Sequence, residues 1–489
     1  MLEELGERAE REIRSRNWSG LWTTALQMKQ QALSLERSIV RQAVPVPTEC
    51  SPSRCYLVTG GAGFIGSHVV RRLLNQGHRV VIIDEFNDYY DPVMKWENVA
   101  DLLRCPQVEL YQADIRDYAQ LRALLLTERF DAIIHLAARA GVRPSLVDPG
   151  LYVTTNVLGT QNMLDLAREF GVTNFVYASS SSVYGGNTDF PFSEIQNVDR
   201  PVSPYAATKK ANELQAACYS RLYQLAASGL RFFTVYGPGG RPDMAVRLFI
   251  EKLERGEPIP LYGDGSFERD YTYVDDIVDG VLGVVNAAAG RDGWNEVFNL
   301  GESDTTSVLQ LILMIAGELG KVNGAGEVKR LSVDSQRKLI DDLAGRGLIT
   351  RLPAQLGDVP KTYADISKAR QMTGYRPKTS IAEGIHKTVR WHLQQQNVAI
   401  EPNRKRIQQA LRLQCALRSR AGLDSVGRRK DPAYEPTDAS NLARTLGDVS
   451  SYDYGQADGA LACRTQRELA DILCDVAVGL RDARPAASG

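Results

Sequence analysis

The chain has little cysteine, almost no net charge and no long hydrophobic run. Its seven cysteines are scattered over 489 residues without zinc-site spacings, which favours a reducing compartment over a disulfide framework. A formal net charge of -1 gives no general attraction to nucleic acid or to a membrane surface. No run reaches the roughly 18 apolar residues of a membrane span, and the polar, acidic first residues are unlike a secretory signal. We therefore expect a cytoplasmic protein that binds no nucleic acid, spans no membrane and holds no metal.

Three segments of the chain differ in pattern. Residues 1–53 hold an apolar stripe at spacings of three and four and then a proline-containing stretch, which predicts a helical N-terminal extension and a linker. Residues 54–396 form the expected catalytic body. Residues 397–489 hold two amphipathic helical patterns around a polar stretch, which predicts a helical, partly disordered C-terminal extension.

Short apolar runs alternate with helix-like stretches from residue 55 onwards. Such alternation indicates βαβ units, so we expect an α/β fold with a Rossmann-type, doubly wound parallel sheet, mainly over residues 54–230. The later part, mainly 231–396, is mixed and rich in glycine and proline, which predicts a smaller mixed α/β substrate-binding portion. Within it, residues 322–350 look like an insertion that contains one short helix.

Gly60, Gly63 and Gly66 follow the first apolar run and open a helix-like stretch. This spacing allows a tight turn, lets the backbone approach a pyrophosphate and presents helix N-terminal N–H groups to it, so it predicts a dinucleotide site. Asp84 follows the next run, about 20 residues on, where a carboxylate can accept both ribose hydroxyls and repel a 2′-phosphate. The expected cofactor is therefore NAD rather than NADP.

Residues at the ends of other runs complete the predicted cofactor site. Asp114 and Ile115 could flank an adenine ring, although a generic turn explains them nearly as well. Small side chains after the fourth run would let a cofactor lie close to the backbone. Besides the glycines and Asp84, the set comprises Phe64, Ile65, Asp114, Ile115, Ala137, Ala138, Lys209 and Tyr236.

Tyr205 and Lys209 are spaced by one helical turn. A tyrosine with its ordinary pKa near 10 is a poor base at neutral pH unless positive charge favours its phenolate, and Lys209 can supply that charge from the same face. Ser180, in a serine-rich stretch after a predicted strand, would hydrogen-bond the reacting hydroxyl. These three residues are the predicted catalytic set.

Taken together, the motifs resemble the extended short-chain dehydrogenase/reductase family, and within it the NAD-dependent nucleotide-sugar epimerases. The resemblance covers about residues 54–320 and 352–392. It implies that Tyr205 removes a proton from the sugar O4 while C4 gives a hydride to bound NAD, and that the 4-keto sugar turns over before hydride returns to its other face. It also implies a homodimer whose contacts include the helix that carries Tyr205.

Two stretches resemble those of UDP-glucuronate 4-epimerases in particular. They imply that Ser181, Ser182, Thr234 and Arg241 gather around the substrate carboxylate. An arginine fork with hydroxyl donors suits a carboxylate, whereas a neutral hydroxymethyl group would leave Arg241 unpaired. Related decarboxylases and dehydratases carry acidic residues where this chain has two serines, so the serines favour epimerisation.

Two more arginines are expected at the substrate. Arg269 resembles the arginine that binds the UDP diphosphate in the family, and Arg247 is a weaker candidate for the same contact.

The expected function is therefore the interconversion of UDP-glucuronate and UDP-galacturonate. The alternatives are a UDP-glucose or UDP-N-acetylhexosamine 4-epimerase, a UDP-glucuronate decarboxylase and a non-enzymatic NAD-binding scaffold. The terminal helices and the insertion are expected to mediate self-association or to bind a partner enzyme of polysaccharide synthesis.

Overall fold

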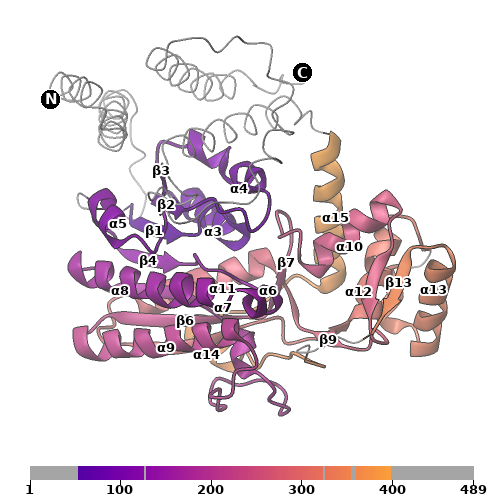
Figure 1. Ribbon diagram of the computed structural model, residues 1–489. Helices are drawn as coiled ribbons and strands as arrows, with labels where there is room; N and C mark the ends of the chain where they lie inside the picture. Colours follow the sequence, from indigo (N-terminus) through magenta and orange to yellow (C-terminus); the bar gives the residue numbers. More distant parts are fainter. Residues whose placement is uncertain (1–52, 126–127, 323–324, 354–358, 398–489) are drawn as a thin grey trace, which may run out of the picture.

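A seven-stranded parallel sheet forms the centre of the computed structural model, which describes residues 53–397 apart from 126–127, 323–324 and 354–358 (Figure 1). The predicted terminal extensions lie outside the described residues. The strand order is β11-β6-β5-β4-β1-β2-β3, and each neighbouring pair is parallel. The strands are β1 (Cys55–Thr59), β2 (Arg79–Asp84), β3 (Val108–Gln112), β4 (Ala132–His135), β5 (Asn174–Ser180), β6 (Ala226–Phe232) and β11 (Asn295–Leu300).

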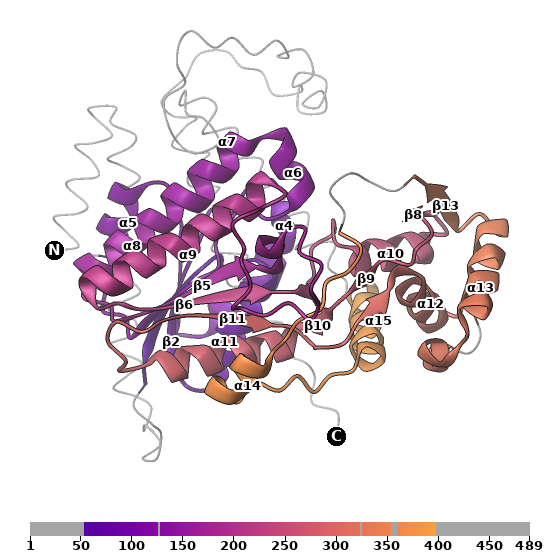
Figure 2. The ribbon, with the colours of Figure 1, turned by 90° about the horizontal axis from the view of Figure 1, so that it is seen from below.

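Helices cover both faces of this sheet (Figure 2). One face is covered by α3 (Phe64–Asn75), α11 (Val274–Ala288) and α14 (Ser367–Thr373), and the other by α5 (Tyr118–Leu125), α8 (Gly159–Glu169) and α9 (Pro204–Tyr223). The central strands are therefore buried on both sides, which is why they read as continuous apolar runs rather than as alternating ones. The predicted doubly wound α/β fold is confirmed.

Short helical segments lie in the connections between these elements. They are α4 (Pro92–Val99), η1 (Leu102–Arg104), α6 (Val142–Val147), α7 (Pro149–Tyr152), the π-helical turn η2 (Val153–Leu158) and η3 (Ser181–Tyr184). The strand order reverses at β1, whose neighbours are β2 and β4. In open α/β sheets, ligands bind outside the carboxyl ends of the strands at such a reversal.

A smaller portion packs beside the sheet and shares its hydrophobic core with the α3 and α11 layer (Figure 1). Its helices are α10 (Ala245–Arg255), α12 (Val308–Glu318), η4 (Ala325–Arg330), α13 (Val333–Gly345) and α15 (Ile381–Asn397). Its strands pair two by two: β7 (Thr234–Tyr236) with β10 (Tyr271–Tyr273), β9 (Glu268–Arg269) with β12 (Thr306–Ser307), and β8 (Ile259–Tyr262) with β13 (Ile349–Leu352).

The segment predicted as an insertion contains more than the one expected short helix. It forms η4 and α13 and ends in β13, which pairs in parallel with β8. Ile340 and Leu343 of α13 are buried in the same core as α12. The segment is therefore part of the packed interior of the smaller portion, a role that the polar sequence of its helix did not reveal.

No described helix is long and apolar enough to cross a membrane. Within the same described ranges, no group of three or more acidic, histidine or cysteine residues is arranged to hold a metal ion.

A buried ion pair joins α9 to the sheet. Arg231 of β6 donates from Nε and Nη2 to the two carboxylate oxygens of Glu213, at 2.8 and 2.9 Å, and Ser179 of β5 donates to the same carboxylate at 2.8 Å. Both charged side chains are almost fully buried. The ring of Tyr184 stacks beneath the guanidinium, 4.9 Å from its central carbon. One cluster thus ties together a helix and two strands.

We predict that Glu213→Gln lowers the free energy of unfolding by about 3–5 kcal/mol, because it leaves the Arg231 charge buried without a counter-charge. Urea unfolding followed by circular dichroism measures the change. Glu383→Gln is the matched control, since Glu383 pairs with Lys387 at 2.7 Å on an exposed helix surface and its loss is worth at most about 1 kcal/mol. Equal effects of the two substitutions would contradict the prediction.

Candidate functional site

A cleft of about 430 Å³ lies at the carboxyl ends of the strands around the topological reversal. It is lined by residues from the loops after β1, β2, β3, β4 and β5, from α9, and from β7 and the loop after it. Sixteen of the predicted residues line it: Gly60, Gly63, Phe64, Ile65, Gly66, Asp84, Ile115, Ala137, Ala138, Ser180, Ser181, Ser182, Tyr205, Lys209, Thr234 and Arg241. The fold therefore brings the predicted cofactor and substrate residues into one cleft.

Four predicted residues lie outside the lining of this cleft. The Asp114 carboxylate is paired with the guanidinium of its neighbour Arg116, at 2.6 Å from Nη2. Tyr236 is a core residue that is 3% exposed, and its hydroxyl donates to the carbonyl of Ile381. Tyr236 thus belongs to the hydrophobic core and is not among the residues that line the cleft, so its contact with the cofactor stays a prediction.

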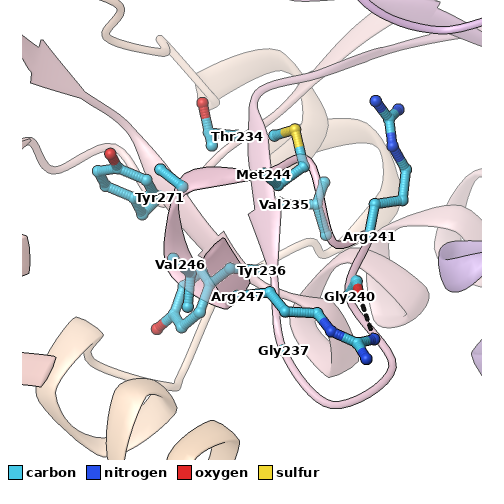
Figure 3. Close-up of a pocket in the computed structure, with 11 residues that line it drawn as sticks. Thr234, Val235, Tyr236, Gly237, Gly240, Arg241, Met244, Val246, Arg247 and Tyr271 are labelled. Carbon is cyan, nitrogen blue, oxygen red and sulfur yellow. Dashed lines mark hydrogen bonds between the residues drawn. The ribbon is translucent and has the colours of Figure 1, made fainter. Parts of the chain in front are cut away.

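Arg247 and Arg269 also point elsewhere. Arg247 donates to the carbonyl of Gly240 at 2.8 Å and forms an ion pair with Glu251. Figure 3 shows the side chain of Arg241 pointing away from that of Arg247, which is turned toward Gly240. Arg269 donates to the carbonyl of Glu268. Neither Arg247, on α10, nor Arg269, on β9, lines the cleft that holds Tyr205.

The turn after β1 has no room for side chains. A Cβ on Gly60, which has a φ of +70°, would lie 2.7 Å from the backbone nitrogen of Ala137, and one on Gly66 would lie 2.1 Å from the carbonyl oxygen of Gly60. Helix α3 begins at Phe64 with Gly63 as its N-cap and with no capping side chain. Its first N–H groups are therefore free to bind phosphate oxygens, which fits the pyrophosphate of a dinucleotide.

Asp84 is held at the end of β2 by two backbone donors. Its carboxylate accepts from the N–H of Phe86 at 2.9 Å and from that of Ala62, in the glycine turn, at 3.2 Å. The side chain is 7% exposed, and burial raises the pKa of its carboxyl above the ordinary value, against the charge of Lys95 and the hydrogen bonds. Both the glycine turn and this carboxylate fit the adenosine half of NAD.

Tyr205 and Lys209 occupy the first turns of α9, which begins at Pro204 with Ser203 as a capping side chain. The Lys209 Nζ donates to the carbonyl of Ala178 in β5 at 2.8 Å. Burial lowers the pKa of Lys209 to about 8, so the ammonium keeps its proton at neutral pH but is close to losing it.

The environment of Tyr205 differs from the expectation in one respect. Burial raises the pKa of the phenol, and a hydrogen bond with Ser180 and the charge of Arg241 oppose that rise. The charge acting on the phenol is thus that of Arg241, whereas Lys209, expected to supply it, is turned toward β5. Ser180 ends β5, and its hydroxyl also accepts from the N–H of Ser182 at the start of η3, which orients it.

Arg241 of the predicted carboxylate pocket is paired with a carboxylate of the protein itself. Arg241 donates from Nε and Nη2 to Asp243, at 2.9 and 2.5 Å. The expectation that a neutral sugar would leave Arg241 unpaired is therefore wrong, because Asp243 is its partner within the protein. An aspartate two residues further along the same loop was the sequence signal for this pair.

Comparison with known proteins gives the family. The family model for the NAD-dependent epimerase/dehydratase family matches residues 56–301. A UDP-glucuronate 4-epimerase from Thermodesulfobacterium geofontis is 41% identical over 337 residues, which cover 69% of this chain and 95% of the relative. The chain belongs to the NAD-dependent epimerase/dehydratase family. Membership confirms the resemblance inferred from the motifs and NAD as the cofactor.

Two solved structures of similar proteins share the architecture of this family member. One is a UDP-glucuronic acid 4-epimerase from Bacillus cereus in complex with UDP-glucuronic acid and NAD, with 32% identity and a TM-score of 0.60. The other is a UDP-glucose 4-epimerase from Thermotoga maritima with UDP-glucose, with 32% identity and a TM-score of 0.59. Each covers 70% of this chain, which in turn covers 99% of each.

Sequence reasoning missed several residues that line the cleft of this epimerase/dehydratase. Asn87, Tyr89 and Tyr90 come from the stretch between β2 and α4, and Lys95 comes from α4 itself. Lys95 is 5% exposed and donates to the backbone and side-chain oxygens of Asn87. Two adjacent tyrosines shortly after Asp84 were a visible signal, but nothing in their spacing showed that the segment lines the cleft.

His135 ends β4 just before the loop that lines the cleft. We expect this side chain to make the free energy of unfolding of the protein depend on pH. The ring lies between the hydroxyls of Thr59 and Thr160, at 2.7 and 3.1 Å, and burial, aided by the Lys209 charge, lowers its pKa from 6.5 to about 3. Below pH 6.5 the unfolded chain gains a proton that the folded protein does not accept. Stability should therefore fall between pH 6.5 and 3, by up to about 1.4 kcal/mol per pH unit from this group.

Urea unfolding at several pH values tests this expectation. His135→Gln keeps a hydrogen-bonding side chain and removes the titration, so its stability should fall less steeply with acid than that of the parent. His386→Gln, which removes a half-exposed imidazole paired with Glu318, is the control. Parallel curves for the parent and His135→Gln would contradict the expectation.

Proposed function

We propose that this protein interconverts UDP-glucuronate and UDP-galacturonate by NAD-dependent epimerisation at C4 of the sugar. One observation carries the proposal: Tyr205, Ser180 and Lys209 line the same cleft as the glycine turn, two further serines and Arg241. The relative from Thermodesulfobacterium geofontis and the Bacillus cereus enzyme support it, since both are named for this activity.

The residues of the cleft have separate roles in this proposal. The glycine turn and Asp84 would hold NAD, which when bound supplies a reversible acceptor for the hydride of C4. Tyr205 takes the proton of the sugar O4 and later returns it, while Ser180 holds that oxygen by a hydrogen bond. Lys209 would orient the nicotinamide ribose, and the charge of Arg241, which opposes the rise in the Tyr205 pKa, assists loss of the tyrosine proton.

The hydroxyl groups near Arg241 protect the oxidised sugar. Oxidation of C4 in a glucuronate gives a β-keto acid, which loses CO2 readily when its carboxylate is stripped of hydrogen bonds. Ser181, Ser182 and Thr234 line the cleft with Arg241 and would keep that carboxylate charged and hydrogen-bonded. No acidic side chain stands in the place of the two serines to repel it, which favours epimerisation over decarboxylation.

A specific observation keeps a second activity open. Because Asp243 pairs with Arg241, binding of a neutral sugar would not leave the guanidinium without a counter-charge. Epimerisation of UDP-glucose or UDP-N-acetylhexosamine is therefore the second candidate, and the Thermotoga maritima structure belongs to an enzyme of the first kind. A non-enzymatic NAD-binding scaffold is disfavoured, since it would not need a tyrosine, a serine and a lysine together in one cleft.

The proposal predicts that purified protein with catalytic NAD converts UDP-glucuronate to UDP-galacturonate without releasing CO2. Nuclear magnetic resonance of the sugar ring identifies the product, and a parallel assay measures CO2. Tyr205→Phe should lower kcat by about a hundredfold or more while binding of UDP-glucuronate persists, because only proton transfer is lost. A pentose product with CO2 would replace the proposal with a decarboxylase, and turnover of UDP-glucose alone would replace it with the second candidate.

We also propose a homodimer formed through the helices around Tyr205. The neighbouring elements α6, η2 and α9 expose large apolar side chains that a second copy would cover. They are Leu146, Val147, Val153, Leu158, Leu214 and Leu222, between 47% and 87% exposed.

Leu214→Glu should shift the protein from dimer to monomer in analytical ultracentrifugation, because it places a charge within the covered surface. Ile195→Glu is the matched control, since Ile195 is 94% exposed on a loop outside these helices. A parent protein that sediments as a monomer, or a dimer unaffected by Leu214→Glu, would contradict the proposed interface.

Other expectations remain proposals. We propose residues 54–396 as the catalytic unit and the terminal extensions, 1–53 and 397–489, as segments for self-association or partner binding. The cytoplasm is the proposed location, supported by the free thiols of Cys55, Cys105 and Cys218 in the described part of the chain.

A further inference from the structure

The guanidinium of Arg241 is occupied along one edge only. Asp243 accepts from Nε and Nη2, so this pair fills the side edge of the fork. Among the described residues, none accepts a hydrogen bond from Nη1, whose two N–H groups remain for a ligand. Arg241 lines the cleft whereas Asp243 does not, so the arginine stands between the internal carboxylate and the cleft.

Tyr89 contacts both members of this pair. Its hydroxyl accepts from Arg241 Nη2 at 3.3 Å and donates to Asp243 at 3.2 Å, and its ring lies 5.2 Å from the central guanidinium carbon. The hydroxyl also lies against Gly141, where a Cβ would come within 3.0 Å of it. Three loops, after β2, β4 and β7, therefore meet at the Arg241–Asp243 pair.

We propose that Asp243 is a specificity-determining residue: it neutralises Arg241, so that a substrate carboxylate gains only the Nη1 end of the fork and a neutral sugar leaves the arginine paired. This inference rests on the proposed function, because it concerns the sugar that enters the same cleft. The carboxylate of Asp243 would then compete with the carboxylate of a uronate for the guanidinium of Arg241.

The charges of Arg241 and Asp243 indicate how removal of Asp243 would change the preference between neutral and anionic sugars. The Arg241 side chain is 19% exposed and that of Asp243 is 42% exposed, so the arginine depends on a nearby anion more than the aspartate depends on a cation. Without the Asp243 charge, a neutral ligand would bury an unpaired guanidinium, while a carboxylate would pair with it. The repulsion between Asp243 and the substrate carboxylate would vanish as well.

Asp243→Asn, which keeps the shape of the side chain, should therefore raise the preference for a uronate. With NAD-loaded protein, titration calorimetry gives the Kd of UDP-glucuronate and of UDP-glucose. We expect the ratio of the two affinities to shift toward UDP-glucuronate by about tenfold or more. The same shift should appear in the ratio of the KM values for the two sugars. If Asp243 had only a structural role, its replacement would weaken the binding of both nucleotide sugars by the same factor.

Two controls and a second charge-removing variant make the result decisive. Asp101→Asn removes a carboxylate from a similar two-point pair with Arg71 on another surface, and it should leave the ratio unchanged. Asp243→Glu keeps the charge and should keep the parental ratio. Asp243→Ser removes the charge in a second way if the asparagine variant does not fold.

An unchanged ratio, or one that moves toward UDP-glucose, in both charge-removing variants would overturn the role of Asp243. The proposed function is tested separately by turnover of UDP-glucuronate in the parent protein. Binding of the two nucleotide sugars needs no turnover, so the two ideas can fail independently.

Discussion

The buried ion pair between Arg231 and Glu213 is the contact on which the position of the reacting side chains depends. Glu213 lies one helical turn beyond Lys209 on α9, and Arg231 lies on β6. Ser179, which donates to the same carboxylate, directly precedes Ser180. The tyrosine, the lysine and the serine are thus carried by elements that share one buried cluster. Burial makes the pair costly to separate, since either charge alone would lack both water and a partner.

The parallel sheet supplies the second constraint. All seven strands point the same way, so the loops that follow them gather along one edge, and the reversal of strand order at β1 opens a cleft there. Residues separated by more than 150 positions, such as Gly60 and Arg241, line that cleft together. The proton-transfer groups and the proposed carboxylate pocket are therefore neighbours because of topology rather than because of any local motif.

The positive charge of Arg241, which the motifs assign to the substrate, is balanced within the protein by Asp243. Arg241 acts at once on the phenol of Tyr205 and on the carboxylate of Asp243. A ligand that changes the pairing of Arg241 would also change the field at the base. Recognition of the sugar and activation of the tyrosine are thereby coupled through one guanidinium group, whereas Lys209 is anchored to β5.

The sequence alone determined the fold class, the glycine turn, Asp84 and the spacing of Tyr205 and Lys209, because these features depend on local periodicity and on contacts within one βαβ unit. It also indicated the family, since the motifs occur in a specific order. Only the tertiary structure decided that Tyr236 is a core residue, that Arg247 and Arg269 are held by backbone carbonyls, and that Tyr89 and Asp243 surround Arg241. The physical reason is that the partner of a long charged side chain is set by which loops meet in space, and neither composition nor periodicity carries that information.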